Sequence, residues 1–206
     1  MKKEGNNPNL IVLDKDEQKL VFGLIVGIPV EVTLTENFGL YTALTYHQKG
    51  IKVEQSYPFF DSYTELEGIT KLNYLELPVQ CKYYITNKTL SAYVALGPSF
   101  GYLINGRFKI DSQTINENDE ISYINSDEKI KSKDLKDSGI KILDVSLVLG
   151  GGISYKVGIG DIFLNINYSH GFTNILDDSV TEVYEGVTQK NRGVNITCGY
   201  LINLSK

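Results

Sequence analysis

Hydrophobic and polar residues alternate along most of the chain, most clearly over residues 71–103. Within residues 75–85 every second position is apolar or aromatic, and the intervening positions hold polar residues, proline or tyrosine. A second alternating run covers residues 90–103, after a polar turn at residues 86–89. Alternation with a period of two is typical of a β-strand whose two faces meet different surroundings. The pattern therefore predicts an antiparallel hairpin with one apolar and one polar face.

The same alternation predicts eight strands in the whole chain. They cover residues 9–13, 19–34, 38–55, 71–85, 90–103, 140–157, 162–169 and 194–202. Tight turns connect strands at residues 35–37, 86–89 and 158–161, whereas polar loops connect them at residues 56–68, 106–139 and 174–189. Short and long connections thus alternate. The longest one, residues 106–139, is too polar for a core and is expected to be a long solvated loop, with room for strand extensions at its base.

Two all-β architectures fit these two-faced strands. In an eight-stranded antiparallel up-and-down transmembrane β-barrel, the apolar face meets lipid and the polar face fills the lumen. In a soluble or periplasmic lipocalin-like barrel, the apolar face lines a cavity for a lipid or another apolar ligand. Short periplasmic turns, long extracellular loops and strands of about 9–11 residues are typical of outer-membrane barrels. The pattern favours the membrane barrel, in which Leu96 faces outward and Ser99 inward.

Composition narrows the class of protein further. The chain has 206 residues and is expected to form a single outer-membrane β-barrel domain over residues 1–206. No apolar run approaches the roughly 18 residues of a membrane helix. The 14 tyrosines include several at apolar positions near strand ends, as in the aromatic belts of membrane proteins. With a net charge of −5 and no basic stripe along the sequence, no binding of nucleic acid is expected.

Cysteine and histidine are too few to build a site. Cys81 and Cys198 fall on apolar faces of predicted strands, where a free cysteine behaves as a small hydrophobe. His47 and His170 are the only histidines, and with two cysteines they do not supply the ligand pattern of a metal site. No disulfide, metal or cofactor is expected. Because the chain opens with charged and polar residues, an apolar signal peptide is expected to have been removed upstream.

The polar faces of the predicted strands carry charged residues that would point into the lumen. These residues are Glu31, Lys49, Glu76, Lys82, Asp144 and Lys156. An eight-stranded barrel has an interior that side chains can just fill, and buried ions need partners of opposite charge. We expect the charges to form a structural polar plug, while a narrow conduit and a binding site are the alternatives. Inward glycines would make room for Tyr41, Tyr74, Tyr84 and Tyr93.

Catalysis has one candidate motif. Some small outer-membrane barrels are lipid hydrolases, in which a histidine acts with serine or aspartate near the rim. Ser169 and His170 are adjacent here, but neighbours on a strand face opposite ways and cannot act as a dyad. Both histidines are therefore expected at the outer rim, in contact with the membrane interface. The protein is not expected to be an enzyme.

Four segments resemble a known family. They are TYHQKGIKV (residues 45–53), KLNYLELPVQCKYY (residues 71–84), YVALGPSFGYLI (residues 93–104) and INYSHGFTNI (residues 166–175). In content, order and spacing they are similar to the PorT-like outer-membrane β-barrel family of Bacteroidetes. The resemblance implies an eight-stranded barrel made with a signal peptide and inserted in the bacterial outer membrane. The founding member is associated with protein secretion across that membrane.

Two features depart from the family pattern. The chain ends LINLSK, where such barrels commonly end on an aromatic residue, and NLIVL (residues 9–13) stands where a glycine-rich first strand is usual. The expected function is that of an integral outer-membrane protein with a filled lumen and a structural or interaction role. Its partners would be outer-membrane lipid and envelope or secretion proteins, reached through residues 56–68 and 106–139. The apolar-ligand barrel and the lipid hydrolase are the two alternatives.

Overall fold

The structure is a computed structural model that describes residues 18–59, 62–86, 89–115, 120–137, 139–177 and 188–202. Within these residues it has nine strands and one helix. The strands are β1 (Gln18–Leu20), β2 (Ile25–Thr33), β3 (Phe38–Phe59), β4 (Ser62–Thr86), β5 (Leu90–Ile115), β6 (Ile121–Lys131), β7 (Leu143–Val157), β8 (Gly160–Gly171) and β9 (Arg192–Ile202), and the helix is α1 (Ser132–Asp137). No described helix is long and apolar enough to cross a membrane.

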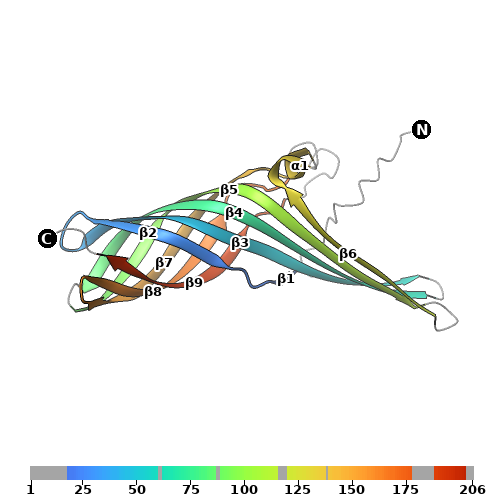
Figure 1. Ribbon diagram of the computed structural model, residues 1–206, viewed down its shortest axis with the longest axis horizontal. Coiled ribbons are helices and arrows are strands. Elements are labelled where there is room, and N and C mark those ends of the chain that lie inside the picture. Colours follow the sequence, from blue (N-terminus) through green and yellow to red (C-terminus); the bar gives the residue numbers. More distant parts are fainter. Residues whose placement is uncertain are drawn as a thin grey trace.

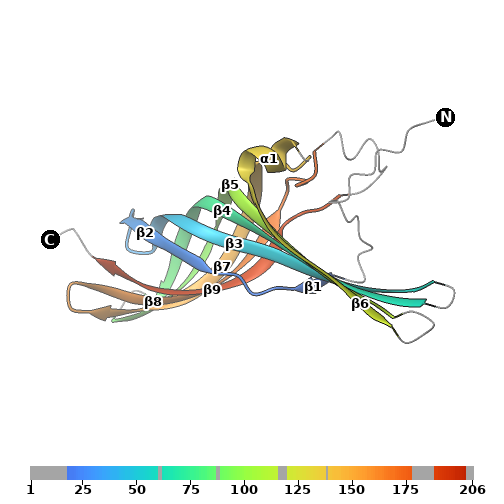
Figure 2. The ribbon, with the colours of Figure 1, turned by 45° about the vertical axis from the view of Figure 1, so that its right-hand side comes forward.

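All nine strands belong to one antiparallel sheet. Its order is β1-β3-β4-β5-β7-β8-β9, with β2 also paired to β3 and β6 also paired to β5. We call β2, β3, β4, β5, β7, β8 and β9 the barrel wall. Beyond the wall, β3, β4 and β5 continue side by side with β1 and β6 as a narrow twisted sheet (Figures 1 and 2). We call this sheet the extension; it begins at the row in which Gly50, Lys71, Arg107 and Lys129 are Cα partners.

The wall strands have the two unlike faces that the sequence predicts. Along β5, side chains alternate between exposed and buried from Ser91 to Leu103. Leu96 is 48% exposed on the outside, whereas Ser99 is 2% exposed on the inside. Large apolar side chains are likewise exposed on β2, β4, β7, β8 and β9. The outside of the wall is therefore apolar and its inside is polar, which is the reverse of a barrel that encloses an apolar cavity.

The described sheet is not a closed eight-stranded barrel, and in this respect it differs from the prediction. β2 and β9 come near each other, but no backbone ladder joins them within the described residues. Both run from the extension toward the short turns, because Thr33 pairs with Gly39 and Ile202 with Gly160. An odd number of antiparallel wall strands leaves the first and last strands parallel. The predicted first strand, residues 9–13, lies outside the described residues.

The two long loops predicted at residues 56–68 and 106–139 are largely strands. β3 and β4 stay paired as far as Phe59 and Ser62, and β5 and β6 pair from Asn105 to Ile115 on one strand and Ile121 to Lys131 on the other. The prediction of a long solvated loop is therefore wrong for most of residues 106–139. These strands stand free of the wall, so neither of their faces needs to be apolar. For that reason they lack the alternation by which the wall strands were found.

Candidate functional site

The inside of the barrel wall holds two clusters of charged side chains. In the first, nearer the short turns, Lys82 Nζ lies 2.7 Å from Glu31 Oε2, and the Tyr84 hydroxyl donates a hydrogen bond to the other oxygen of Glu31. The rings of Tyr41 and Tyr93 flank Lys82, each with its centroid 4.3 Å from Nζ. A cation between two aromatic faces gains electrostatic attraction from both rings. We call this the inner cluster.

The second cluster lies nearer the extension, and we call it the outer cluster. Lys49 Nζ lies 2.5 Å from Glu76 Oε1 and 2.8 Å from Asp144 Oδ2. His47 Nδ1 is 2.7 Å from the second oxygen of Glu76. Asn191 donates a hydrogen bond to Asp144 Oδ2 at 2.9 Å. Two carboxylates thus share one lysine, and a polar neighbour contacts each of them, while Asp144 Oδ1 is buried without a hydrogen-bond partner.

Strand register brings the members of the outer cluster together. Glu76 on β4 and Asp144 on β7 are both Cα partners of Gly101 on β5. A Cβ atom at Gly101 would lie 3.4 Å from Glu76 Oε1 and 3.5 Å from Asp144 Cβ. Because glycine has no side chain, Gly101 leaves space on β5 through which Glu76 of β4 and Asp144 of β7 both reach Lys49.

Other inward glycines make room for aromatic rings. A Cβ atom at Gly152 would lie 2.7 Å from the Tyr93 hydroxyl, and one at Gly199 would lie 2.6 Å from the Phe163 ring. Tyr93 uses this space to donate a hydrogen bond to Asn165. Glycine opposite a large ring is one way in which a narrow lumen is packed without overlap.

Between and above the clusters, the interior is also filled. Gln80 and Ser99, on β4 and β5, are buried between the two clusters. At the mouth toward the extension, Leu135 of α1 packs in a buried apolar cluster with five wall and loop residues. These are Leu72, Tyr74, Leu103, Ile140 and Ile175. The short helix α1 therefore places an apolar cap over a charged interior.

The structure places the six candidate lumen residues unequally. Glu31 and Lys82 meet in the inner cluster, and Lys49, Glu76 and Asp144 meet in the outer one. Lys156 is exposed instead, near the end of β7 and opposite Asp161 of β8. The alternation correctly gives its side of the strand, but at a strand end that side meets solvent rather than the filled interior.

The sequence missed the role of two polar residues. His47 was expected at the rim, and this is wrong, because it is buried against Glu76. Its inward position on β3 was the available signal. Asn191 precedes β9 and lies between the predicted loop (residues 174–189) and the predicted last strand (residues 194–202), so no periodicity pointed to its contact with Asp144.

The candidate catalytic pair stays apart. His170 lies on the outside of β8 between Tyr168 and Phe172, with its ring near both aromatic rings. Ser169 is buried on the inside of the same strand. Cys81 and Cys198 are free and exposed on the outside of the wall. Within the described residues, no group of three histidines, cysteines or carboxylates could hold a metal ion.

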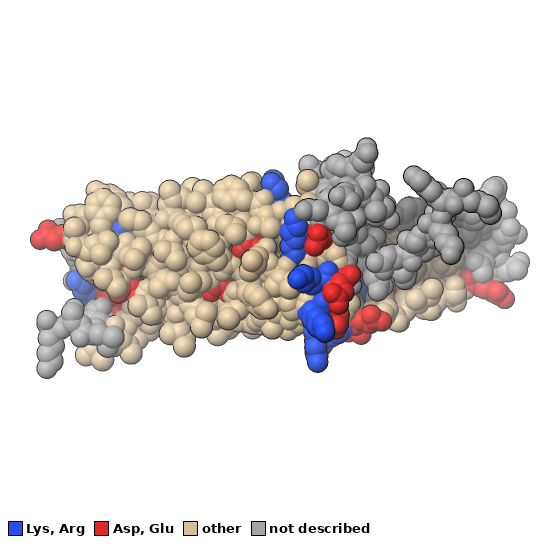
Figure 3. Space-filling model, turned by 90° about the horizontal axis from the view of Figure 1, so that it is seen from above, with Lys and Arg blue, Asp and Glu red and all other residues tan. Residues whose placement is uncertain are grey.

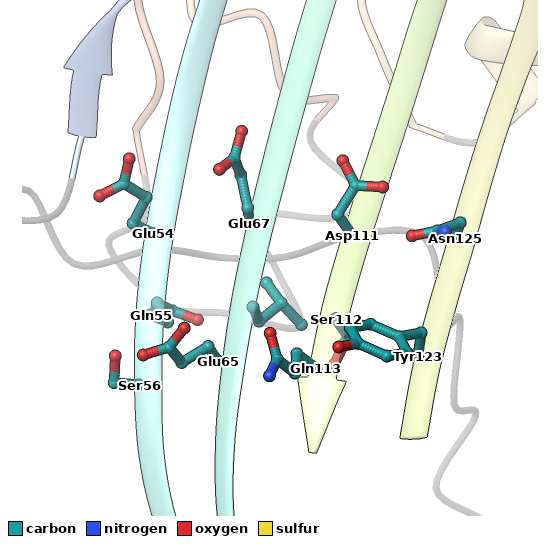
Figure 4. A pocket seen from close by; sticks show the side chains of 11 residues that line it. Glu54, Gln55, Ser56, Glu65, Glu67, Asp111, Ser112, Gln113, Tyr123 and Asn125 are labelled. Carbon is teal, nitrogen blue, oxygen red and sulfur yellow. The ribbon is translucent and has the colours of Figure 1, made fainter. Parts of the chain in front are cut away.

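A groove lies on the extension. Figure 4 shows Glu54, Glu67, Asp111 and Asn125 in one row across β3, β4, β5 and β6. Their Cα atoms are direct partners in the sheet. Glu65, Gln113 and Tyr123 line the groove one row farther out (Figure 4). The groove is therefore polar and open, and three of the four side chains in its first row are carboxylates.

Exposed ion pairs accompany this acidic row. Lys52 Nζ lies 3.0 Å from Glu54 and 2.8 Å from Glu67, and Arg107 forms two hydrogen bonds with Asp127 at 2.8 and 2.6 Å. Hydrogen bonds from Lys19 and Lys52 hold the pKa of Glu54 below its usual range. The hydrogen bonds from Arg107 likewise lower the pKa of Asp127.

The surface of the molecule indicates its environment. Figure 3 shows an almost uncharged surface over the barrel wall that ends at a band of basic and acidic side chains where the extension begins. A water-soluble protein does not expose an apolar belt of this extent. Such a belt around a polar, ion-paired interior defines the class of integral membrane β-barrels.

The comparison with protein families agrees with this class. The chain belongs to the family of the outer membrane protein beta-barrel domain, which matches residues 11–177. Comparisons with curated proteins and with solved structures give no match. The family points to the bacterial outer membrane.

Proposed function

We propose that this protein is an outer-membrane anchor that presents the extension as an interaction surface, and that it is neither a channel nor an enzyme. The observation that carries the proposal is the continuation of β3, β4 and β5 past the apolar belt to form a sheet with β6. Irregular loops would be enough to connect the neighbouring strands of a barrel. A paired sheet with a polar groove offers a partner a fixed surface, and binding usually resides on such outer segments.

The filled interior supports the absence of conduction. The lumen is blocked at three successive levels. These are the inner cluster with Lys82 and Glu31, the outer cluster with Lys49, and the apolar cap at Leu135. An ion would have to break a buried pair at each charged level, which costs several kcal/mol per uncompensated charge. The separated positions of Ser169 and His170 favour the absence of hydrolase activity.

The proposed partners are proteins of the cell envelope, reached through residues 56–68 and 106–139. The four motifs that resemble PorT-like barrels support a finer proposal, namely a role in protein secretion in Bacteroidetes. The polar inner face speaks against the alternative of an apolar-ligand barrel, which would need its apolar face inside.

Site-specific photo-crosslinking in cells tests the interaction surface. A crosslinking residue at Tyr123, 65% exposed in the groove, is compared with one at Ile162, 50% exposed on the wall. We expect a discrete protein adduct at Tyr123 and only lipid adducts at Ile162. Protein adducts at neither position, with both variants folded, would contradict the proposal.

A trimmed variant separates the anchor from its surface. Residues 54–67 and 111–125 are each replaced by a short turn, which preserves the pairs Val53 with Gly68 and Ile110 with Ser126. We expect the trimmed barrel to fold and insert. The strain that carries it should lose the protein secretion that depends on this barrel. Normal secretion by the trimmed strain would remove the finer proposal, and steady ion conductance of the intact chain in planar bilayers would overturn the anchor.

A further inference from the structure

The first row of the extension carries three basic side chains in direct register. Lys71 on β4 is the Cα partner of Arg107 on β5, which is in turn the partner of Lys129 on β6. No basic stripe is visible in the sequence, because these residues come from three separate strands. Like charges directly opposite each other destabilise a sheet. Three cations side by side therefore need anions to balance them.

The protein balances this row only in part. Arg107 is held by Asp127, whose two oxygens accept its hydrogen bonds at 2.8 and 2.6 Å. Lys71 and Lys129 have no ion pair with any residue in the described part of the chain. One row farther out the situation differs, because Lys52 and Lys109 each bind a carboxylate at 3.0 Å or less. In the first two rows of the extension, the lysines without an ion pair are therefore Lys71 and Lys129, both in the row nearer the apolar belt.

The position of the row indicates what would balance it. On β4 the outward apolar run ends at Leu75, and Lys71 is two outward positions farther along the strand. On β5 the outward apolar run ends at Ile104. The next two outward positions are Asn105 and Arg107. The region just beyond the hydrocarbon of a bilayer contains the lipid headgroups. Figure 3 shows the charged band directly at the edge of the uncharged surface.

We propose that Lys71, Arg107 and Lys129 form a binding site for the phosphate groups of a phosphorylated glycolipid in the outer leaflet of the outer membrane. Lysine and arginine make charge-assisted hydrogen bonds to phosphate oxygens. The acyl chains of the same lipid would lie along the apolar outside of β4 and β5, so one molecule contacts both surfaces. The site rests on the extension being on the outer side of the membrane, and it uses no residue of the groove.

Titration of the folded, detergent-solubilised chain tests the site. The probe is bisphosphorylated lipid A, the control lipid is the same molecule without phosphates, and bound lipid is counted by native mass spectrometry. The variant K71Q/K129Q should bind the phosphorylated lipid about tenfold or more weakly, since a basic residue near an anionic surface contributes about 1 kcal/mol and 1.4 kcal/mol is tenfold. The dephosphorylated lipid should bind the intact chain and the variant equally.

The variant K52Q/K109Q is the matched control, because it removes the same charge from the next row of the same face. It should bind within twofold of the intact chain. Equal weakening by both variants, or none by K71Q/K129Q, would overturn the site. Displacement of the lipid by an equal concentration of inorganic phosphate would overturn the lipid as its ligand. The trimmed variant described above keeps all three basic residues and should still bind the phosphorylated lipid. A negative result in the lipid titration therefore does not contradict the proposed interaction surface, and a negative crosslinking result does not contradict the lipid site.

Discussion

Two ion pairs between a lysine and a carboxylate, equal in length, lie in two regions of this protein with different surroundings. Lys82 and Glu31 lie 2.7 Å apart inside the wall, and Lys109 and Asp111 lie 2.7 Å apart on the extension. The exposed fractions of their side chains are 2% and 9% in the first pair but 47% and 35% in the second. The distances are equal, so the two pairs differ in burial and in the tyrosines that surround only the first pair. Breaking a buried pair leaves an uncompensated charge, whereas water replaces the partner in an exposed one.

The largest expected effect is that of Lys82→Met. It leaves the Glu31 carboxylate without its cation among Tyr41, Tyr84 and Tyr93, and we expect a loss of about 3–5 kcal/mol in the free energy of unfolding. Urea unfolding in lipid vesicles, followed by the gel shift between folded and unfolded barrel, measures this loss. Lys109→Met is the control on the extension and should leave the unfolding midpoint unchanged.

The double variant Glu31→Leu/Lys82→Met shows whether the loss comes from the unpaired charge. Replacing both partners by apolar residues removes the charge, so most of the stability should return. If the double variant were as unstable as Lys82→Met alone, packing around the lysine rather than its charge would be the cause, and the comparison between the two pairs would fail.

Lys49→Met should have a smaller effect than Lys82→Met. After its removal His47 still contacts Glu76, and Asn191 still donates to Asp144. We expect a loss of about 2–3 kcal/mol, because each carboxylate keeps one polar partner. The same unfolding measurement applies. A loss larger than that of Lys82→Met would show that the outer cluster, not the inner one, is the less compensated.

Gly152→Ala tests the packing of the lumen without changing charge. Its Cβ atom would lie 2.3 Å from the Leu164 carbonyl oxygen and 2.7 Å from the Tyr93 hydroxyl. Overpacking of this kind costs about 1–3 kcal/mol. Gly193→Ala, on β9, is the matched control, because nothing lies within 4 Å of its added Cβ atom. Equal stability of the two variants would indicate that the β8 backbone at Leu164 and the Tyr93 side chain both shift freely.

The smallest expected effect is a pH dependence at Asp127. The hydrogen bonds from Arg107 lower the pKa of this carboxyl below its ordinary value of 3.8. A carboxyl with a lowered folded pKa contributes stability above its unfolded pKa, and the contribution is lost as the pH falls through the folded pKa. Unfolding at pH 6 and pH 3 should therefore differ slightly more in the intact chain than in Arg107→Gln. The reverse order would contradict the ion pair.

The wall was predictable from sequence because each of its strands separates lipid from a polar interior. Apolar and polar residues therefore alternate along each strand, as at Leu75 and Glu76. This alternation also predicts that the side chains of Glu31, Lys49, Lys82 and Asp144 point inward. The extension was not predictable in this way. Both faces of β6 are exposed along most of its length, so β6 has polar and apolar residues without regular alternation, and only pairing with β5 shows that it is a strand.

The partners within each cluster lie beyond what alternation can give. Periodicity assigns Lys49 and Asp144 to the interior, but their contact depends on the register of four strands and on Gly101 between the carboxylates. Asn191 lies outside any strand. The basic row of the extension was hidden for the same reason, since Lys71, Arg107 and Lys129 become neighbours only through register.

β5 belongs to both regions, and this has a mechanical consequence. Its residues Leu90 to Tyr102 pair with β7 in the wall, and from Asn105 to Ile115 it pairs with β6 in the extension, while β4 accompanies it on the other edge throughout. Ladder hydrogen bonds lie perpendicular to antiparallel strands. A pull on the extension along β5 therefore loads many of these bonds in shear at once, rather than opening them one after another. Tension from a bound partner would pass through this strand into the wall.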